Sequence, residues 1–476
     1  MLFSTVEDLR AEAVDQLHAA TAIYTKGPVV EGLLRRIGWP KREGRILDPS
    51  AGDGSFLIGA LDLMDFAPSD FASVGRVSGM EIHPGAVAEA RDRISEYLVR
   101  RGWSNEGAET AARDMIVEGD FLCDSPVAGE FSMIAGNPPY LRVTNLPTYF
   151  REVYGKIVPA YAQGDILHAF LDRCSEILPA NGVIALVTSD RWLINLTTAE
   201  LRSKLGRTLG LSHIERLDVE SAFYRPKRRV KGSLPRIHPI EVVLEFTGGR
   251  TQPISPDVLL SGGGHADFSM TLADVADVRL APWIGGKNVF VVDQATAARL
   301  APFATLSPAV DTEDIDRDRD VLTAPSRFVI RTTKAEEPTG LLKEHLLAGF
   351  GTLPAKCKDR FERNGIYWLP AEPINLPLSG VRFLIPRIAR RIRVIELPEG
   401  VVPTDHNVQI AVPSHGLAPE MLKEILLSPE CDAYVRTVAQ RLENGFFSIT
   451  TGFLRRMPVP DRFRGAIEPQ RVREAA

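Results

Sequence analysis

The segment Asn137-Pro138-Pro139-Tyr140 points most directly to chemistry in this 476-residue chain. It follows the apolar run FSMIA at 131–135, where a buried strand is expected to end. Two successive prolines donate no backbone hydrogen bond and form a stiff corner, so an amide and an aromatic ring are presented at a fixed place. The Asn137 side-chain oxygen and the Pro138 carbonyl can accept the two hydrogens of an exocyclic amine. The ring of Tyr140 can stack on the base that carries the amine.

A glycine-rich turn, DPSAGDGSF at 48–56, follows the first strand expected upstream. Alone, such a turn is a weak signal, and a tight turn without a ligand explains it equally well. A dinucleotide fits poorly, because Phe56 replaces the third glycine of that fingerprint and Asp48 and Asp53 would face a pyrophosphate. The same carboxylates suit the ammonium and sulfonium groups of S-adenosylmethionine.

The next two expected strands also end in polar residues. GMEIHP places Glu81 where folds of this kind hold a carboxylate against ribose hydroxyls. EGDFL places Asp120 where it can accept from an adenine amino group, and Phe121 where it can pack on the ring. Each residue alone is more simply a helix cap or a solvated loop residue. Three successive strand ends carry a suitable polar residue, in the order in which an adenosine would be contacted. This order favours a nucleoside-containing cofactor.

Short β-rich runs alternate with helical stretches up to residue 247, which predicts an α/β domain with a doubly wound parallel sheet over 1–247. Beyond it glycines and prolines recur and helices are expected to be scarce, apart from one helix at 419–442. We therefore predict a second, mixed α+β domain over 248–465 and a tail over 466–476.

Composition excludes several classes of protein. The net charge of −5 argues against indiscriminate coating of nucleic acid, although a basic cleft on an acidic body remains compatible with it. The four cysteines are widely separated and show no metal-ligand spacing, so no metal site is expected. No apolar run has the length of a membrane span and the first 30 residues do not resemble a signal peptide. We expect a cytoplasmic protein, nucleoid-associated when bound to DNA.

These motifs and their order resemble the S-adenosylmethionine-dependent amino-group DNA methyltransferases, specifically the gamma-type, TaqI-like and Eco57I-like N6-adenine enzymes. The resemblance covers residues 20–247 and includes IYTKGPVV, DPSAGDG, GDF, NPPY and the stretch GDILHAF. It implies a mostly parallel seven-stranded class I methyltransferase sheet and a C-terminal target-recognition domain that binds double-stranded DNA. The cofactor-binding residues that it implies, beside those derived above, are Thr25, Asp48, Ser50, Gly52 and Gly54.

The resemblance also implies a second aromatic that stacks on the flipped base, and Phe223 is the best match. Two basic runs, at 224–236 and 382–393, are expected to contact phosphates, although most charged runs are only solvated. The candidate DNA-binding residues are Arg228, Arg229, Lys231, Arg387, Arg390, Arg391 and Arg393.

Other functions stay open on the sequence. N4-cytosine methylation poses the same chemical problem, and Asn137 only favours adenine. An RNA or protein-glutamine methyltransferase would also use NPPY but would not need the long C-terminal half. A degenerate DNA-binding or specificity subunit without activity would not need to keep DPSAGDG, GDF and NPPY all intact. Fewer than 30 residues precede the cofactor region, so any restriction endonuclease is expected to be a separate chain, and the enzyme is expected to act as a monomer.

Overall fold

The computed structural model describes residues 6–224, 238–261, 270–285, 288–316, 318–406, 408–413, 417–465 and 467. The chain divides into two compact units, 1–266 and 267–476. The sequence predicted a boundary near 248. In the structure the first unit extends further, because Ile254 and Val258 pack in its core. Val258 begins α12 (Val258–Ser261). Within the described ranges no helix is both long and apolar enough to cross a membrane.

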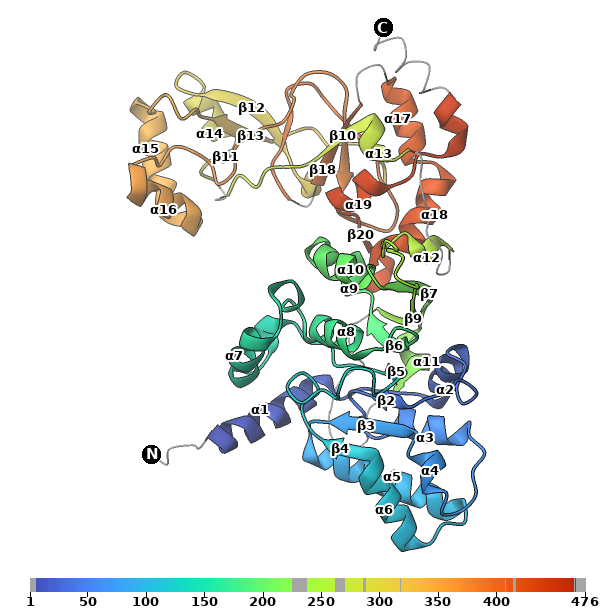
Figure 1. Cartoon of the computed structure of the whole chain (residues 1–476). Helices are drawn as coiled ribbons and strands as arrows, with labels where there is room; N and C mark the ends of the chain where they lie inside the picture. Colours follow the sequence, from blue (N-terminus) through green and yellow to red (C-terminus); the bar gives the residue numbers. More distant parts are fainter. Residues whose placement is uncertain are drawn as a thin grey trace. The chain divides into compact units, whose positions relative to one another are not determined.

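The first unit is built on one seven-stranded sheet (Figure 1). Its order is β4-β3-β2-β5-β6-β9-β7, in which the first five strands are parallel and β9 is antiparallel to both neighbours. The predicted doubly wound, mostly parallel sheet is thereby confirmed. The strands are β2 (Ile46–Asp48), β3 (Val77–Glu81), β4 (Ile116–Glu118), β5 (Met133–Gly136), β6 (Val183–Ser189), β7 (Leu209–Arg216) and β9 (Pro239–Phe246).

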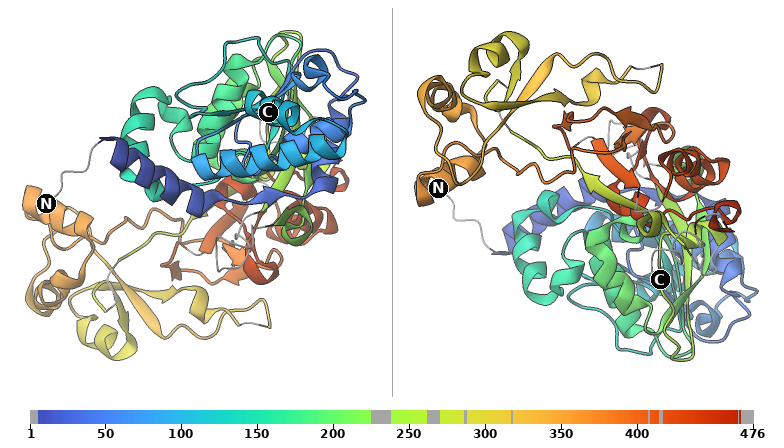
Figure 2. Two further views of the ribbon diagram at one scale, coloured as in Figure 1. Left: turned by 90° about the horizontal axis from the view of Figure 1, so that it is seen from below. Right: turned by 90° about the horizontal axis from the view of Figure 1, so that it is seen from above.

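Helices cover both faces of this sheet, and each face has its own core (Figures 1 and 2). Alternate residues of β6 point to opposite cores, Val183 and Ala185 to one and Ile184 and Leu186 to the other, which explains its continuous apolar run. One core contains α2 (Gly27–Arg36), α3 (Ser55–Asp62), α5 (Pro84–Arg100) and α6 (Asn105–Met115). The other contains α1 (Val6–Thr21), α7 (Thr148–Ile157), α8 (Ile166–Ile177) and α10 (Ala199–Leu205).

A two-stranded ribbon lies outside the main sheet. In it β1 (Tyr24–Thr25) pairs with β8 (Phe223–Tyr224) in antiparallel register, Tyr24 opposite Tyr224 and Thr25 opposite Phe223. The ribbon brings a segment that precedes the glycine-rich turn beside one that follows β7. Two parts of the chain about 200 residues apart therefore meet next to the candidate site.

In its described residues, the second unit contains three small sheets together with helices. The first is β10-β18-β14-β16, made of β10 (Ala276–Leu280), β18 (Val408–Pro413), β14 (Arg382–Pro386) and β16 (Ile395–Leu397). The second is β11-β13-β12-β17, made of β11 (Val291–Asp293), β13 (Arg327–Arg331), β12 (Thr305–Val310) and β17 (Val402–Pro403). The third is β15-β20-β19, made of β15 (Ile388–Ala389), β20 (Phe447–Ser448) and β19 (Gln440–Arg441). The prediction of few helices was wrong for α15 (Gly340–Gly349) and α16 (Ala355–Asn364). The single helix predicted at 419–442 is two, α17 (Pro419–Leu426) and α18 (Pro429–Val438), because Ser428 caps a new start and Pro429 cannot continue a helix.

The basic run at 382–393, which the sequence suggests for phosphate contacts, is not one continuous strand. In the structure β14 (Arg382–Pro386) and the short β15 (Ile388–Ala389) belong to different sheets. Arg382 is completely buried and donates to the carbonyls of Pro377 and Val401, both at 3.1 Å, and of Pro398 at 2.5 Å. The first residue of the run therefore serves the interior of the second unit.

Candidate active site

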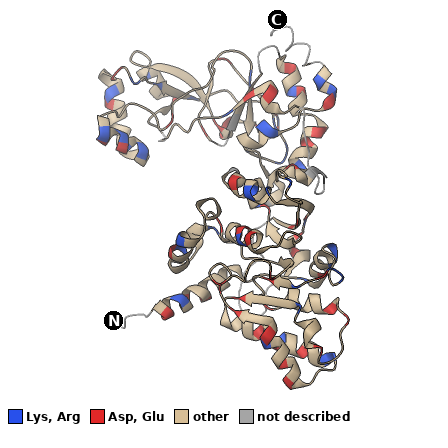
Figure 3. Ribbon diagram, viewed as in Figure 1, with Lys and Arg blue, Asp and Glu red and all other residues tan. Residues whose placement is uncertain are grey.

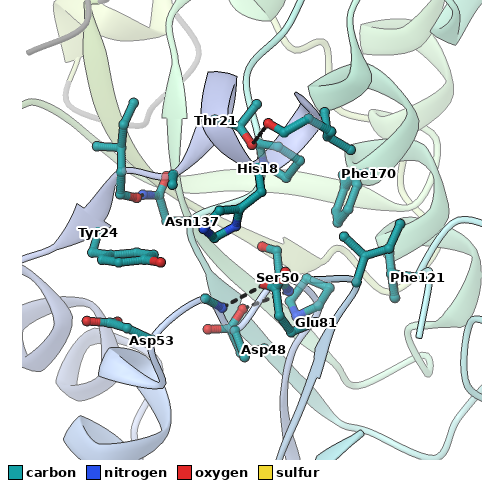
Figure 4. Close-up of a pocket in the computed structure, with 18 of the residues that line it drawn as sticks. His18, Thr21, Tyr24, Asp48, Ser50, Asp53, Glu81, Phe121, Asn137 and Phe170 are labelled. Atoms are coloured by element: carbon teal, nitrogen blue, oxygen red, sulfur yellow. Dashed lines mark hydrogen bonds between the residues drawn. The ribbon is translucent and has the colours of Figure 1, made fainter. Parts of the chain in front are cut away.

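The carboxyl ends of β2, β3 and β5 open into a pocket, which lies within the first unit (Figure 4). The structure brings together in its lining most of the residues predicted from the sequence, namely Thr25, Asp48, Ser50, Gly52, Glu81, Asp120, Phe121, Asn137 and Pro139. Gly54, Pro138, Tyr140 and Phe223 are not among the lining residues.

At its glycines, the glycine-rich turn places backbone without side chains beside the pocket. Gly52 has φ +54°, and a Cβ there would lie 2.8 Å from Cε1 of Tyr24. Gly54 has φ +81° and precedes the first residue of α3. Both positions require glycine. Asp53 anchors the turn, because its carboxylate accepts from Ser55 Oγ at 2.7 Å and from the Tyr224 hydroxyl.

Two buried carboxylates form the floor. Asp48 Oδ1 accepts from the Ser50 N–H at 3.0 Å, and burial raises the pKa of Asp48 to about 8. Glu81 accepts from the N–H groups of Gly52 and His83, each at 2.9 Å, and burial raises its pKa as well. Acids so held favour a cationic or hydrogen-bond-donating ligand, which would stabilise their charged forms.

The far end of the pocket is aromatic. The rings of Phe121 and Phe170, the latter from α8, lie 5.2 Å apart at 32°, and both face the pocket (Figure 4). Asp120 accepts from the Leu122 N–H and from the Tyr154 hydroxyl, each at 3.0 Å. Its carboxylate therefore has a fixed direction beside the two rings.

Thr25 and Ser50 each bring a buried hydroxyl to the site. Thr25 Oγ1 and Ser50 Oγ form no hydrogen bond within the described part of the chain. Since an unsatisfied buried polar atom is costly, a ligand that donates to or accepts from these hydroxyls would offset the cost. The site combines buried acids, the hydroxyls of Thr25 and Ser50, exposed glycine backbone and two aromatic rings. Together these groups match the ammonium, sulfonium, ribose and adenine of a single ligand. The residues present fit S-adenosylmethionine, the predicted cofactor.

Asn137 stands at the corner after β5, beside this pocket. Its Nδ2 donates to the carbonyl of Ile23 at 3.0 Å, which fixes the amide plane. Its Oδ1 contacts the hydroxyl of Tyr140, and that hydroxyl also lies 2.7 Å from the carbonyl of Val187 in β6. Because one hydroxyl proton serves two acceptors, Asn137 Oδ1 can accept another donor while Tyr140 keeps its bond to Val187.

The two aromatics predicted to stack on a base are both packed inward in this conformation. Tyr140 is half-buried between the two cores, and burial raises its pKa well above the ordinary value. Phe223 is 1% exposed and belongs to the core that contains α2 and α3. Their stacking roles stay predictions.

Asp165, which the sequence analysis did not single out, fixes the segment after the corner. Its Oδ1 accepts from the Leu141 N–H and, as N-cap of α8, from the Leu167 N–H, both at 3.1 Å. The Ile166 N–H donates back to the Leu141 carbonyl at 3.0 Å. The Gly-Asp pair before an apolar helical run was the available signal, because Asp is a favoured N-cap.

The structure describes only some of the candidate DNA-binding residues. Arg228, Arg229 and Lys231 lie outside the described residues. Arg391 and Arg393 share Asp320, at 3.0 and 2.7 Å, and the guanidinium of Arg390 lies 5.0 Å from the centre of the Phe446 ring. Lysines and arginines are interspersed with acidic residues along the described ribbon (Figure 3). Their DNA contacts stay predictions, and the ion pairs of Arg391 and Arg393 would have to be exchanged.

A second polar cluster lies at the β7–β9 edge of the sheet. Ligand atoms of His213, Glu215 and Glu241 lie within 4.8 Å of one another, an arrangement that the sequence analysis, which expected no metal site, did not anticipate. Arg36 from α2 pairs with Glu215 at 3.3 Å and with Glu241 at 3.2 Å, and His213 lies 2.8 Å from Glu241. An ion-pair network accounts for these contacts.

Three comparisons bear on the family. Residues 90–223 match the Eco57I restriction-modification methylase family. The chain is 28% identical over 216 residues to the Type II methyltransferase M.XhoI of Xanthomonas vasicola, covering 42% of this chain and 39% of that protein. It is 28% identical over 217 residues to M.PaeR7I of Pseudomonas aeruginosa, covering 43% and 38%. The chain thus spans about two fifths of the length of the curated relatives it matches.

Among solved structures, the Type IIL restriction-modification enzyme MmeI, solved in complex with DNA, has a similar fold. The TM-score is 0.52 at 13% identity, and the match covers 99% of this chain and 70% of that one. At that identity the likeness concerns the fold of the chain. Together with the match at 90–223, these relatives confirm the resemblance to the Eco57I-like restriction-modification methylases.

Proposed function

We propose that this protein is a DNA methyltransferase that uses S-adenosylmethionine to methylate N6 of an adenine extruded from double-stranded DNA. One observation carries the proposal: Asn137, at the rigid corner after β5, lines the same pocket as Asp48 and Glu81. An amide oxygen suited to an exocyclic amine thus adjoins a site that fits the methyl donor. When bound, the cofactor supplies an electrophilic methyl group.

The residues of the corner would orient the amine. With Nδ2 held by Ile23, Asn137 Oδ1 accepts one amine hydrogen, and the carbonyl of Pro138 accepts the other. The two bonds turn the nitrogen lone pair toward the donor and stabilise the positive charge that develops on nitrogen. Tyr140 is displaced from Asn137 and keeps Val187 as its acceptor. Orientation and charge stabilisation do the work that a strong base would otherwise do.

Recognition of DNA is assigned to the second unit, 267–476. Its support is the fold, which resembles an enzyme solved in complex with DNA over nearly the whole chain. The Type II methyltransferases among the relatives support a restriction-modification role. We favour adenine over cytosine because residue 137 is an asparagine, and we propose that the base is extruded because an exocyclic amine inside a stacked duplex could not reach Asn137.

The test is expression in a host without DNA methylation, followed by sequencing that separates N6-methyladenine from N4-methylcytosine. Methyladenine confined to one short DNA motif is expected. Asn137→Ala should abolish it while leaving S-adenosylhomocysteine binding nearly intact. Asn145→Ala, an exposed asparagine in the following 3₁₀ turn (Val143–Asn145), is the matched control and should retain it. N4-methylcytosine would establish the cytosine alternative. Unmodified DNA from a folded, cofactor-binding protein would contradict the DNA substrate and favour RNA or a protein glutamine.

A further inference from the structure

The pocket has a wall that none of the predicted cofactor residues supplies. Leu17, His18 and Thr21, from the last turns of α1, line it opposite the floor formed by Asp48 and Glu81. His18 is 9% exposed, and its side chain reaches into the pocket from α1 (Figure 4). A polar side chain that is buried at the edge of a ligand pocket is a candidate ligand contact.

The position of His18 is set by a second histidine. The rings of His18 and His83 are stacked, with centroids 3.9 Å apart and an interplanar angle of 19°. His83 Nδ1 accepts from the Ala86 N–H at 3.1 Å, and Nε2 lies 3.0 Å from Asp15 Oδ1. Because Nδ1 is an acceptor, Nε2 is the protonated nitrogen and donates to Asp15. Both ring nitrogens of His83 are engaged, so its ring gives His18 a fixed surface.

The same histidine is tied to the floor of the pocket. The backbone N–H of His83 donates to Glu81 Oε1 at 2.9 Å, while Glu81 Oε2 accepts from Gly52. Asp15 and His18 belong to α1, and Glu81 ends β3. The wall and the carboxylate expected to hold the ribose therefore form one hydrogen-bonded and stacked unit. His18 is placed on the nucleoside side of the pocket, which Glu81, Phe121 and Phe170 also line.

We infer that His18 is a further cofactor-binding residue, whose ring nitrogen hydrogen-bonds a polar atom of the nucleoside half of S-adenosylmethionine. The inference rests on the proposed function for the identity of the cofactor. His83 acts as a positioning residue, because it stacks on His18 and caps α5 but does not line the pocket.

The test uses calorimetry with two ligands and the full-length chain. S-adenosylhomocysteine contains both halves of the cofactor, and 5′-methylthioadenosine contains the nucleoside half without the amino acid. His18→Ala should weaken both ligands by a similar factor of about ten, the cost of one lost hydrogen bond in a buried site. Gln16→Ala, on the exposed face of α1, should bind both ligands as the unaltered protein does.

His18→Phe keeps a ring against His83 and removes the nitrogens, so it should fold as the unaltered chain does and still lose affinity for both ligands. A His18→Phe protein that binds both ligands normally would overturn the role of the nitrogen. Loss of S-adenosylhomocysteine binding alone would overturn the assignment to the nucleoside half. If the unaltered protein binds neither ligand, the proposed function itself fails and the inference fails with it.

Discussion

The carboxylate of Asp165 offers a quantitative test of how the corner after β5 is held. Asp165→Ala removes the acceptor of two N–H groups, the buried one of Leu167 and the part-buried one of Leu141. An unsatisfied buried donor costs about 1–3 kcal/mol, and loss of an N-cap costs about 1 kcal/mol. Since the Leu167 bond is also the cap of α8, the two costs overlap, and we expect a loss of about 2–4 kcal/mol. Asp165→Asn keeps an oxygen acceptor and should lose less than about 1 kcal/mol.

Urea denaturation followed by tyrosine and tryptophan fluorescence measures this difference. With a slope of about 3 kcal/mol/M, the Asp165→Ala midpoint should fall by about 1 M, and the Asp165→Asn midpoint should move by a third of that or less. Methyl transfer to DNA, measured well below the denaturation midpoint, should be strongly reduced in Asp165→Ala because Leu141 directly follows the catalytic corner. It should be largely retained in Asp165→Asn. Equal effects of the two substitutions would refute the role assigned to the acceptor oxygen.

Three further outcomes are expected. Burial raises the pKa of Asp48 to about 8, above its ordinary value of about 4, so the folded ligand-free protein binds a proton that the unfolded chain releases. Its stability should fall as the pH rises from about 4 to about 8, and Asp48→Asn should flatten this part of the curve in urea titrations; an unchanged curve would contradict the shift. Truncation after Ala266 should leave S-adenosylhomocysteine binding in the first unit and abolish site-specific DNA binding in gel-shift assays. A truncated protein that still modifies its site would refute the assignment of recognition to 267–476. DNA affinity of the full chain should fall steeply with salt despite the net charge of −5, and an affinity independent of salt would exclude phosphate contacts.

The site residues at strand ends could be predicted because parallel strands meet at one edge of a sheet. Asp48, Glu81 and Asn137 each end or follow an apolar run, and the topology alone brings such positions together. His18 and Phe170 could not be found in this way. They lie on helices whose apolar spacing shows which face is buried but not which turn reaches the edge of the sheet.

Long-range pairing limited the predictions for the basic residues. Arg391 and Arg393 pair with Asp320, which lies more than 70 residues earlier in the chain. No local pattern predicts such a partner, so a basic run read from sequence overstates the basic surface. Phe223 was assigned by its place in a motif, and the structure shows it buried and paired with Thr25; its stacking role stays a prediction.

The reversed direction of β9 has a consequence for how this protein can change. Because β9 runs antiparallel to β7, the connection between them leaves and re-enters the sheet at one place, where the Leu217 N–H donates to the Pro239 carbonyl at 2.9 Å. That place is at the carboxyl ends of the parallel strands, the same edge as the pocket. The entropy of closing a loop grows only slowly with its length, so residues can be added between Tyr224, where the pairing with β1 ends, and the start of β9 at little cost to the sheet. The connection is therefore a natural graft point, where new contacts to a substrate can be acquired without refolding the catalytic unit.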